Sequence, residues 1–194
     1  MPIMPQFSAE FVSAYPYDPE KGKALMAEAG VTGDTSFNMV VWNTPPYTDF
    51  AQAIQATIAS AGITLNLEVV DGKQWLTRYR NADLEIWLGL WGPDYPDPDG
   101  NVTPFTNYAA KSIAWRNAWE NAELGELGKQ AAVEQDNTKR AELYKQLTER
   151  VLNEGPYVVL YQPTRSYGVR NNVSGFMYDP ASTPSIWFWM ISKK

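Results

Sequence analysis

Apolar and polar residues alternate along the first half of the chain with two periods, one typical of strands and one typical of helices. Residues 63–70 place apolar side chains at every second position, which predicts a strand with one covered face. Residues 36–42 are a further strand candidate, and residues 84–91 are a short apolar run, the pattern of a strand buried inside a sheet. Three strands are therefore expected in this half of the chain.

Three helices are expected before and between those strands. The first is residues 18–30, in which Asp18 is placed as an N-cap and Gly30 as a C-terminal stop. The second is residues 46–62, whose apolar residues recur four positions apart, and the third is residues 72–81. Helices and strands thus alternate along the chain.

This alternation indicates an α/β fold. Units of strand, helix and strand join by right-handed crossovers and give a largely parallel sheet with helices on its faces. Ligands of such sheets bind beyond the carboxyl ends of the strands. The residues that leave the third predicted strand, Trp91 to Asp99, are therefore expected at the edge where a binding site forms.

The second half of the chain has a different pattern. Apolar residues at helical spacing predict two helices, at residues 121–135 and 137–155. Residues 157–163 and 164–171 are predicted as two more strands. The chain ends in a contiguous apolar run, Ile186 to Ile191, which as a strand would need cover on both faces.

Composition and charge exclude several classes of function. The 194 residues carry a net charge of -6, which argues against binding to a nucleic-acid backbone. With no Cys and no His, the chain lacks the groups of Ser-His and Cys-His nucleophile systems and of the common zinc sites. No apolar run is long enough to cross a bilayer, and the first residues lack the basic start and apolar centre of a signal peptide.

The stretch WGPDYPDPD, after the third predicted strand, gathers three aspartates among prolines and aromatic residues. A calcium loop is disfavoured, because Val102 and Tyr108 occupy the positions where an EF-hand requires glycine and glutamate. A carboxylate pair for glycoside hydrolysis stays open, although nothing singles out a second carboxylate. The interpretation that uses most of the stretch is a single buried aspartate, flanked by aromatic residues, that accepts a cationic ligand group, with ring faces adding cation–π attraction.

Two further clusters are candidates for a ligand site. Arg116 lies between Trp115 and Trp119, where its guanidinium either binds a ligand carboxylate or stacks on an indole at the surface. Trp42 ends the first predicted strand, at the same carboxyl edge as the aspartates, and Tyr47 follows it. The prolines between those two residues are equally well explained as a helix start.

Four stretches of the chain resemble, in order, one known family. They are YDPEKGKALMAEAG, the stretch from ITLNLEVV to DPDGN, NTKRAELYKQLTERVLNEGPYVVLYQP, and RNNVSGF. Together they resemble the C-terminal half of the extracellular solute-binding proteins of family 5, the dipeptide, oligopeptide and nickel receptors of bacterial ABC importers. The resemblance covers residues 16 to 180, and the order of several motifs makes it specific.

The resemblance implies a lobe of the type II periplasmic-binding-protein kind, with a mixed, mostly parallel sheet flanked by helices. Residues 1–180 would be the C-terminal ligand-binding lobe of a two-lobed receptor. Residues 181–194 would form a tail that packs on the N-terminal lobe or folds back. Without that lobe, we expect the apolar run Trp187 to Ile191 to drive self-association.

The resemblance also implies a role for Asp94. In peptide-binding members, the aspartate of a W-x-x-D motif holds the α-ammonium of the ligand, and Trp91 and Asp94 match that motif, with Tyr95 beside them. No Arg or His stands just before Trp91 to hold the ligand carboxylate, so Arg116 is our substitute for that role. Because of this departure from the family pattern, nickel chelates, opines and sugars stay open as ligands besides peptides.

These features predict a non-catalytic, extracytoplasmic substrate-binding component of an ABC importer, which binds a peptide or related small solute and docks on a membrane permease. We expect no cofactor, no metal and no nucleic-acid partner. The alternative function is a carboxylate-dependent hydrolase that acts on carbohydrate.

Overall fold

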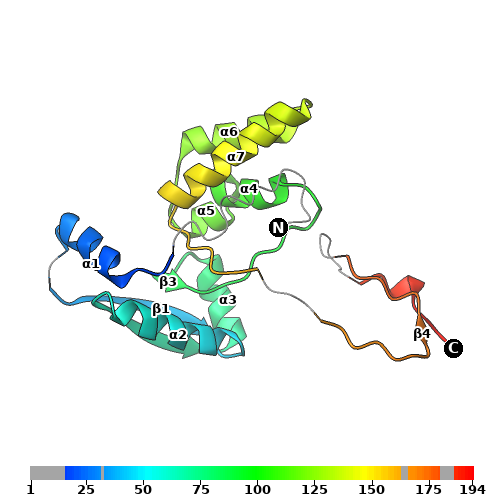
Figure 1. Cartoon of the computed structure of the whole chain (residues 1–194), viewed down its shortest axis with the longest axis horizontal. Helices are drawn as coiled ribbons and strands as arrows, with labels where there is room; N and C mark the ends of the chain where they lie inside the picture. The colour runs from blue at the N-terminus through cyan, green and yellow to red at the C-terminus, as the bar shows by residue number, and fades with distance from the viewer. Residues whose placement is uncertain (1–15, 32, 163–165, 180–185) are drawn as a thin grey trace. The chain divides into compact units, whose positions relative to one another are not determined.

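The computed structural model describes residues 16–31, 33–162, 166–179 and 186–194 of the chain. These residues belong to two compact units, one that runs to Leu90 and one that contains Trp91–Lys194. Figure 1 labels their helices and strands. Each unit has a hydrophobic core of its own.

The unit that runs to Leu90 contains a three-stranded parallel sheet. Its central strand is β1 (Thr35–Trp42), which pairs with β2 (Ile63–Val70) on one side and with β3 (Ile86–Trp87) on the other. The predicted parallel pairing and the bounds of β2 are confirmed. β3 is much shorter than the predicted strand at residues 84–91, because only two of these residues pair with β1.

The helix α2 (Tyr47–Ala59) connects β1 to β2 and covers one face of this sheet (Figure 1). Its Ala51 is fully buried in one cluster with Met39 and Val41 of β1 and Leu65 of β2. The three strand residues have odd numbers, and alternate residues of a strand point to the same face. This apolar layer is the core of the unit.

The helix α3 (Gly72–Arg80) connects β2 to β3 and covers the opposite face. Asp71 caps it by accepting two hydrogen bonds from backbone N–H groups of its first turn. Trp75 of this helix stacks on Trp42, an even-numbered residue of β1, and the fully buried Val40 shares that face. In the strand order β2-β1-β3, the connection from β2 to β3 passes over β1 on the face opposite α2.

The first helix, α1 (Pro19–Glu28), has the predicted ends. The Asp18 carboxylate accepts a hydrogen bond from the Lys21 backbone N–H at 2.9 Å. Gly30 follows the helix with a φ of 71°, a left-handed conformation that glycine adopts without steric cost.

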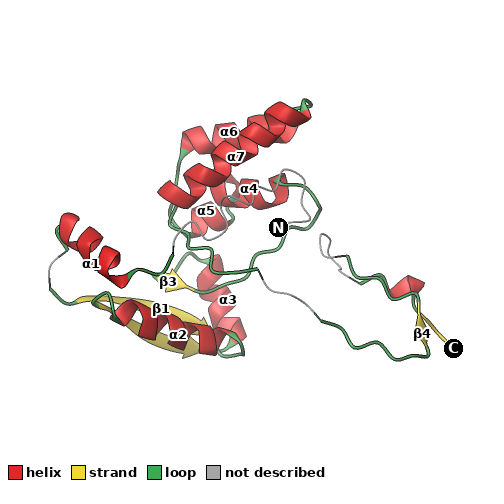
Figure 2. Ribbon diagram, viewed as in Figure 1, coloured by secondary structure: helices red, strands yellow, loops and turns green. Residues whose placement is uncertain are grey.

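The unit that contains Trp91–Lys194 is mainly helical, as Figure 2 shows. Its α-helices are α4 (Asp99–Thr106), α5 (Ile113–Arg116), α6 (Ala122–Val133) and α7 (Asn137–Glu154), and its 3-10 turns are η2 (Tyr108–Ala110) and η3 (Phe188–Met190). α6 and α7 confirm two predicted helices, with Asn121 and Asp136 as their N-caps. The pattern of the sequence did not indicate α4 and α5, because α4 contains Pro104 and α5 is a single turn.

The core of this unit lies between α6 and α7. Leu124 and Ala131 of α6 are fully buried in one cluster with Tyr144 and Leu147 of α7. Residues of each helix in this cluster recur at a helical spacing, so they form one stripe on that helix. This core holds the two long helices together.

The prediction of strands at residues 157–163 and 164–171 is wrong for the part that the structure describes. Residues 157–162 and 166–171 have no strand pairing, and residues 163–165 lie outside the described part. Val158 is 84% exposed. An apolar run becomes a strand only where a neighbouring strand completes its backbone hydrogen bonds, and no described strand lies there to do so.

The last described residues pair with the segment before them. β4 (Val173–Ser174) pairs antiparallel with β5 (Ser192–Lys193). Gly175 follows β4 with a φ of 74°, and a Cβ atom there would lie 1.9 Å from the Met190 carbonyl oxygen. Glycine is thus required where the two segments meet. Of the predicted tail, residues 181–185 lie outside the described part.

Candidate functional site

The residues that follow β3, numbers 91–98, form a loop that we call the aspartate loop, and they pack on the helix after it. Trp91 donates a hydrogen bond from its indole Nε1 to the carbonyl oxygen of Gly100 at 3.3 Å, and its ring meets Phe105 edge-on. Pro93 is buried, and it lies so close to Gly100 that a Cβ atom on this glycine would be 3.0 Å from the Pro93 Cβ. The first half of the loop is therefore held against α4.

Asp97 holds the second half of the loop to α7. The Nη2 atom of Arg140 donates to both carboxylate oxygens of Asp97, at 2.8 and 2.9 Å, and the backbone N–H of Asp99 donates to one of them at 2.9 Å. Burial alone would raise the pKa of Asp97, but the hydrogen bonds from Arg140 and from the Asp99 backbone outweigh it and lower this pKa. Asp97 is therefore a charged structural residue.

Asp99 is also occupied within the fold. Its carboxylate accepts hydrogen bonds from the Tyr95 hydroxyl, at 2.7 Å, and from the Thr103 hydroxyl one turn along α4. The hydrogen bond to this carboxylate raises the pKa of Tyr95 to about 12, because it stabilises the protonated phenol. Two of the three aspartates thus serve local structure.

Asp94 differs from both neighbours. The expectation of a buried aspartate is wrong for Asp94, because this residue is exposed to solvent. Its carboxylate meets no hydrogen-bond donor or cation within the part of the chain that the structure describes. The exposed rings of Trp91 and Tyr95 stand three positions before it and one position after it in the sequence. The loop therefore presents one uncommitted negative charge with aromatic side chains near it in the chain.

Trp115 and Arg116 lie on α5 and are half-buried. α5 packs on α4, the helix that also carries the aspartate loop. Both candidates thus belong to the same unit as Asp94, and the role of Arg116 as a carboxylate ligand stays a prediction.

Trp42 belongs to the other unit, at the carboxyl end of β1. Its ring stacks on Tyr47 at 5.4 Å and on Trp75 at 6.4 Å between centroids. Trp75 and Tyr79 extend this stack along α3. A Cβ atom on Gly72 would lie 2.8 Å from the Trp42 indole nitrogen, so glycine is needed there to admit the ring.

Sequence analysis missed Arg140 as a residue of this region. Its Nε atom donates to the Ala131 carbonyl at 3.1 Å, and its guanidinium lies 5.1 Å from the centroid of the Tyr144 ring. A signal was present, because Arg140 stands seven positions before Leu147 and so shares the apolar face of α7. A charge on the buried face of a helix needs a partner.

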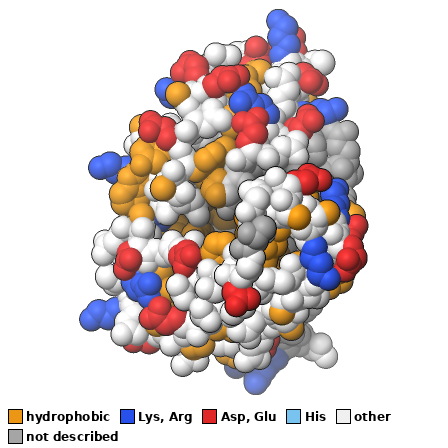
Figure 3. All heavy atoms as spheres, turned by 90° about the vertical axis from the view of Figure 1, so that its left-hand side faces the viewer, with side chains coloured by type: hydrophobic (Ala, Val, Ile, Leu, Met, Phe, Trp, Pro, Cys, Tyr) orange, Lys and Arg blue, Asp and Glu red, His pale blue; other side chains and the backbone are white. Residues whose placement is uncertain are grey.

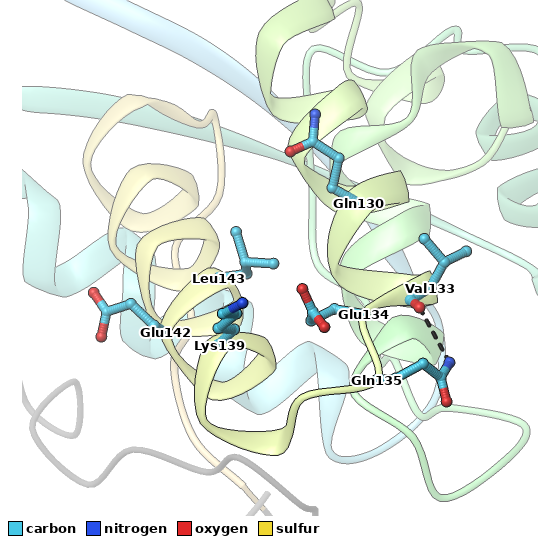
Figure 4. A pocket seen from close by; sticks show the side chains of 7 residues that line it. All are labelled: Gln130, Val133, Glu134, Gln135, Lys139, Glu142 and Leu143. Carbon is cyan, nitrogen blue, oxygen red and sulfur yellow. Dashed lines mark hydrogen bonds between the residues drawn. The ribbon is translucent and has the colours of Figure 1, made fainter.

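The pocket shown in Figure 4 lies between the C-terminal end of α6 and the first half of α7 and has a volume of about 640 Å³. Its lining residues are Gln130, Val133, Glu134, Gln135, Lys139, Glu142 and Leu143. None of the predicted site residues lines it, and its mixed charges favour no ligand class.

Acidic and basic side chains are mixed on the surface (Figure 3). Figure 3 shows Lys and Arg side chains interspersed with Asp and Glu on one face of the molecule, rather than gathered into a basic tract. The described residues contain no cluster of three or more acidic side chains suited to a metal ion. Within the same residues, no helix is long and apolar enough to span a membrane.

Comparisons with known proteins place this fold and loop in one family. The profile of the bacterial extracellular solute-binding proteins, family 5 Middle, matches residues 1–112. The di/tripeptide-binding protein 2 of Pseudomonas aeruginosa is 32% identical over 174 residues, which cover 87% of this chain and 32% of that protein. The dipeptide-binding protein of Escherichia coli is 30% identical over 177 residues, 87% of this chain and 33% of that protein.

A solved structure gives the same result. The periplasmic binding protein DppA of Helicobacter pylori, in complex with the peptide STSA, superposes with a TM-score of 0.82 at 25% identity, over 100% of this chain and 38% of that one. The predicted lobe of the type II periplasmic-binding-protein kind is thereby confirmed. The chain spans about a third of the length of the curated relatives it matches. It belongs to the bacterial extracellular solute-binding proteins, family 5.

Proposed function

We propose that this chain is a ligand-binding lobe of an ABC-importer receptor for short peptides, in which Asp94 binds the α-ammonium group of the ligand. The observation that carries this proposal is the exposed Asp94 carboxylate, which has no partner among the described residues. The two aspartates that follow it, Asp97 and Asp99, both accept hydrogen bonds from side chains of the same unit. An uncommitted carboxylate on a held loop suits a cationic ligand group.

The names of the relatives support a peptide as that ligand. Two of the relatives that match this chain are a di/tripeptide-binding and a dipeptide-binding protein, and the solved structure holds a peptide. A free peptide carries an α-ammonium at neutral pH, and the exposed rings of Trp91 and Tyr95 would add cation–π attraction. We assign the ligand carboxylate to Arg116 on α5, and a further contact to Trp115.

The same contacts argue against the alternative, a carbohydrate hydrolase. Such an enzyme needs two carboxylates, one as acid and one as base or nucleophile. Asp97 is held by Arg140, and Asp99 accepts two hydroxyl hydrogen bonds. Neither is available as the partner of Asp94, so we propose a receptor without catalytic activity.

The complete receptor would contain a second lobe. Because the chain spans about a third of its curated relatives, the ligand would be enclosed by parts that lie outside this sequence. We propose that residues 1–180 form the C-terminal lobe, that residues 181–194 pack on the other lobe, and that the receptor works outside the cytoplasm with a membrane permease.

The test is calorimetry on the full-length gene product with the dipeptide Ala-Phe and with N-acetyl-Ala-Phe, which lacks the ammonium group. Asp94→Asn should weaken Ala-Phe binding by about 10- to 100-fold, the value of a hydrogen bond to a charged group. It should leave the weak binding of the acetylated peptide unchanged.

The matched control is Asp49→Asn, which removes an exposed aspartate from α2. Ala-Phe affinity should be the same as in the unaltered protein. Equal losses for both peptides in Asp94→Asn would reject the role of Asp94 as the ammonium ligand.

A further inference from the structure

We infer that Arg140 of α7 is the positioning residue of the ligand site, because through Asp97 it holds the aspartate loop in the conformation that presents Asp94. This inference rests on the proposed function and adds a residue that does not contact the ligand. It is argued from contacts within the unit that contains Trp91–Lys194.

Arg140 is itself fixed by several contacts. Its Nε atom donates to the carbonyl of Ala131 on α6, and its guanidinium lies over the ring of Tyr144, whose hydroxyl accepts from Nη2 at 3.3 Å. Tyr144 is 2% exposed and belongs to the core between α6 and α7. The side chain of Arg140 is only 15% exposed, so its position is set by the packing of two helices.

Through its ion pair with Asp97, the fixed Arg140 side chain also restrains the aspartate loop. Both carboxylate oxygens of Asp97 accept from Arg140, so the carboxylate can neither rotate nor swing away without losing a hydrogen bond. One of the same oxygens accepts from the Asp99 backbone N–H at the start of α4. The end of the aspartate loop is thereby tied to α4 and α7 together.

Asp94 lies between this tie and the contacts of Trp91 and Pro93 with α4. Only two residues separate Asp94 from Trp91 on one side and from Asp97 on the other, and these include Pro93 and Pro96. A short loop held at both ends and stiffened by prolines has little conformational entropy left to lose when a ligand binds. Loss of the Arg140 tie should release one end and lower the affinity of Asp94 for a cation.

The chain provides a matched control on the same helix. Arg150 of α7 also forms ion pairs, with Glu123 at 2.8 Å and with Glu154 at 2.7 Å, but these partners are far from the loop in sequence and more exposed. Arg140→Gln and Arg150→Gln make the same chemical change on one helix. Only the first variant removes a contact of the aspartate loop.

The first measurement is amide hydrogen exchange by NMR on the full-length protein without ligand. The reporters are the amides of Asp97, which donates to the Tyr95 carbonyl, and of Asp99, which donates to the Asp97 carboxylate. Both should exchange at least tenfold faster in Arg140→Gln and at the original rate in Arg150→Gln. Unchanged rates in Arg140→Gln would overturn the inference.

The second measurement is calorimetry with Ala-Phe and N-acetyl-Ala-Phe. Arg140→Gln should weaken Ala-Phe binding by about tenfold and reduce the preference for the free peptide over the acetylated one, which a general loss of structure would not do. Arg140→Lys, which keeps the charge, should restore part of that preference. Asp97→Asn should match Arg140→Gln, and the double variant should be no worse than either, because the two residues act as one pair.

The outcomes separate this inference from the proposed function. If the unaltered protein binds no peptide, or if Asp94→Asn binds Ala-Phe as before, the proposed function fails and the exchange rates alone decide whether Arg140 holds the loop. If Asp94→Asn weakens binding but Arg140→Gln keeps full affinity despite faster exchange, the positioning role of Arg140 is overturned.

Discussion

The aspartate loop and the start of α4 carry three aspartates within six residues, Asp94, Asp97 and Asp99. These aspartates differ in the hydrogen-bond donors that lie near their carboxylates. Asp97 meets the guanidinium of Arg140, and Asp99 meets the hydroxyls of Tyr95 and Thr103. Asp94 meets no donor among the described residues. Substitution of Asp97 or Asp99 should therefore affect the stability of the fold, whereas substitution of Asp94 should affect ligand binding.

The charge of Asp97 should make stability depend on pH. Its native pKa lies below the ordinary 3.8, so the ion pair stabilises the fold above that pH, and the stabilisation is lost as the pH falls through the native pKa. Asp97→Asn should lower the free energy of unfolding by about 1 kcal/mol at pH 7, a small value because a third of the side chain faces water.

Urea denaturation at pH 7 and at pH 3 measures this effect. The difference between the two proteins should shrink at pH 3, because below about pH 3.8 the unfolded chain takes up a proton at Asp97 more readily than the folded protein does. A difference that stays constant between these pH values would show that the charge of Asp97 contributes nothing.

A second prediction at this scale concerns Gly72. A Cβ atom there would lie 2.8 Å from the Trp42 indole nitrogen, so Gly72→Ala must displace the ring from its stack on Trp75. Overpacking of about 1–3 kcal/mol exceeds the gain of about 1 kcal/mol that alanine gives a helix. The midpoint of thermal unfolding should fall, and the near-ultraviolet circular dichroism of the stacked indoles should weaken.

Gly168→Ala is the matched control for that change. A Cβ atom at Gly168 would have no described atom within 4 Å. Both signals should therefore stay as they are in the unaltered protein, and an equal effect of the two substitutions would count against steric displacement of Trp42.

At the scale of helices and strands, the core between α6 and α7 carries the next prediction. Leu147 is fully buried there, so Leu147→Ala should lower the free energy of unfolding by about 2–5 kcal/mol. Val133, the last residue of α6, is 71% exposed, so Val133→Ala should change it by less than about 0.5 kcal/mol. Chemical denaturation of both variants checks the difference, and equal losses would reject the assignment of the core.

The sequence predicted the helices and strands whose periodicity and end signals lie entirely within their own residues. β2 alternates along its whole length, and α1 carries both its cap and its stop, so their bounds agree with the structure. Asn121 and Asp136 likewise fix the starts of α6 and α7. Capping and periodicity are local properties that sequence displays directly.

The sequence could not predict elements that depend on distant partners. Residues 84–91 and 157–162 have the apolar composition of strands, but whether they pair depends on neighbouring strands elsewhere in the chain. The partner of Asp97 stands 43 residues away on α7. For the candidate site, sequence singled out Asp94 as the uncommitted charge but not the arginine that holds its loop.

At the scale of the whole molecule, the proposed function predicts that one lobe of the receptor binds ligand far more weakly than the two lobes together. Binding sites for small ligands bury 70–90% of the ligand, and a single lobe can cover only one side of it. The 194-residue chain alone should bind Ala-Phe at least about 100-fold more weakly than the full-length gene product. Calorimetry on both proteins checks this, and micromolar or tighter binding by the chain alone would contradict it.

The isolated chain should also self-associate through its exposed apolar tail. Phe188 and Trp189 are 70% and 75% exposed, and the Trp189 ring stacks on Trp187. The sedimentation coefficient of the chain should rise with concentration, and it should rise less in the double variant Phe188→Ser and Trp189→Ser. Val133→Ser, which removes an equally exposed apolar residue from α6, should leave the concentration dependence unchanged.

The contact between Asp97 and Arg140 has a consequence for the order of events during folding. It closes a loop of 43 residues, whereas the contacts of Trp91 with Gly100 and of Tyr95 with Asp99 join residues within 9 positions. Long loops cost more entropy to close, so the local contacts form first. During synthesis, we therefore expect the contact between Asp97 and Arg140 to form only after α7 has left the ribosome, later than the local contacts that hold the aspartate loop against α4.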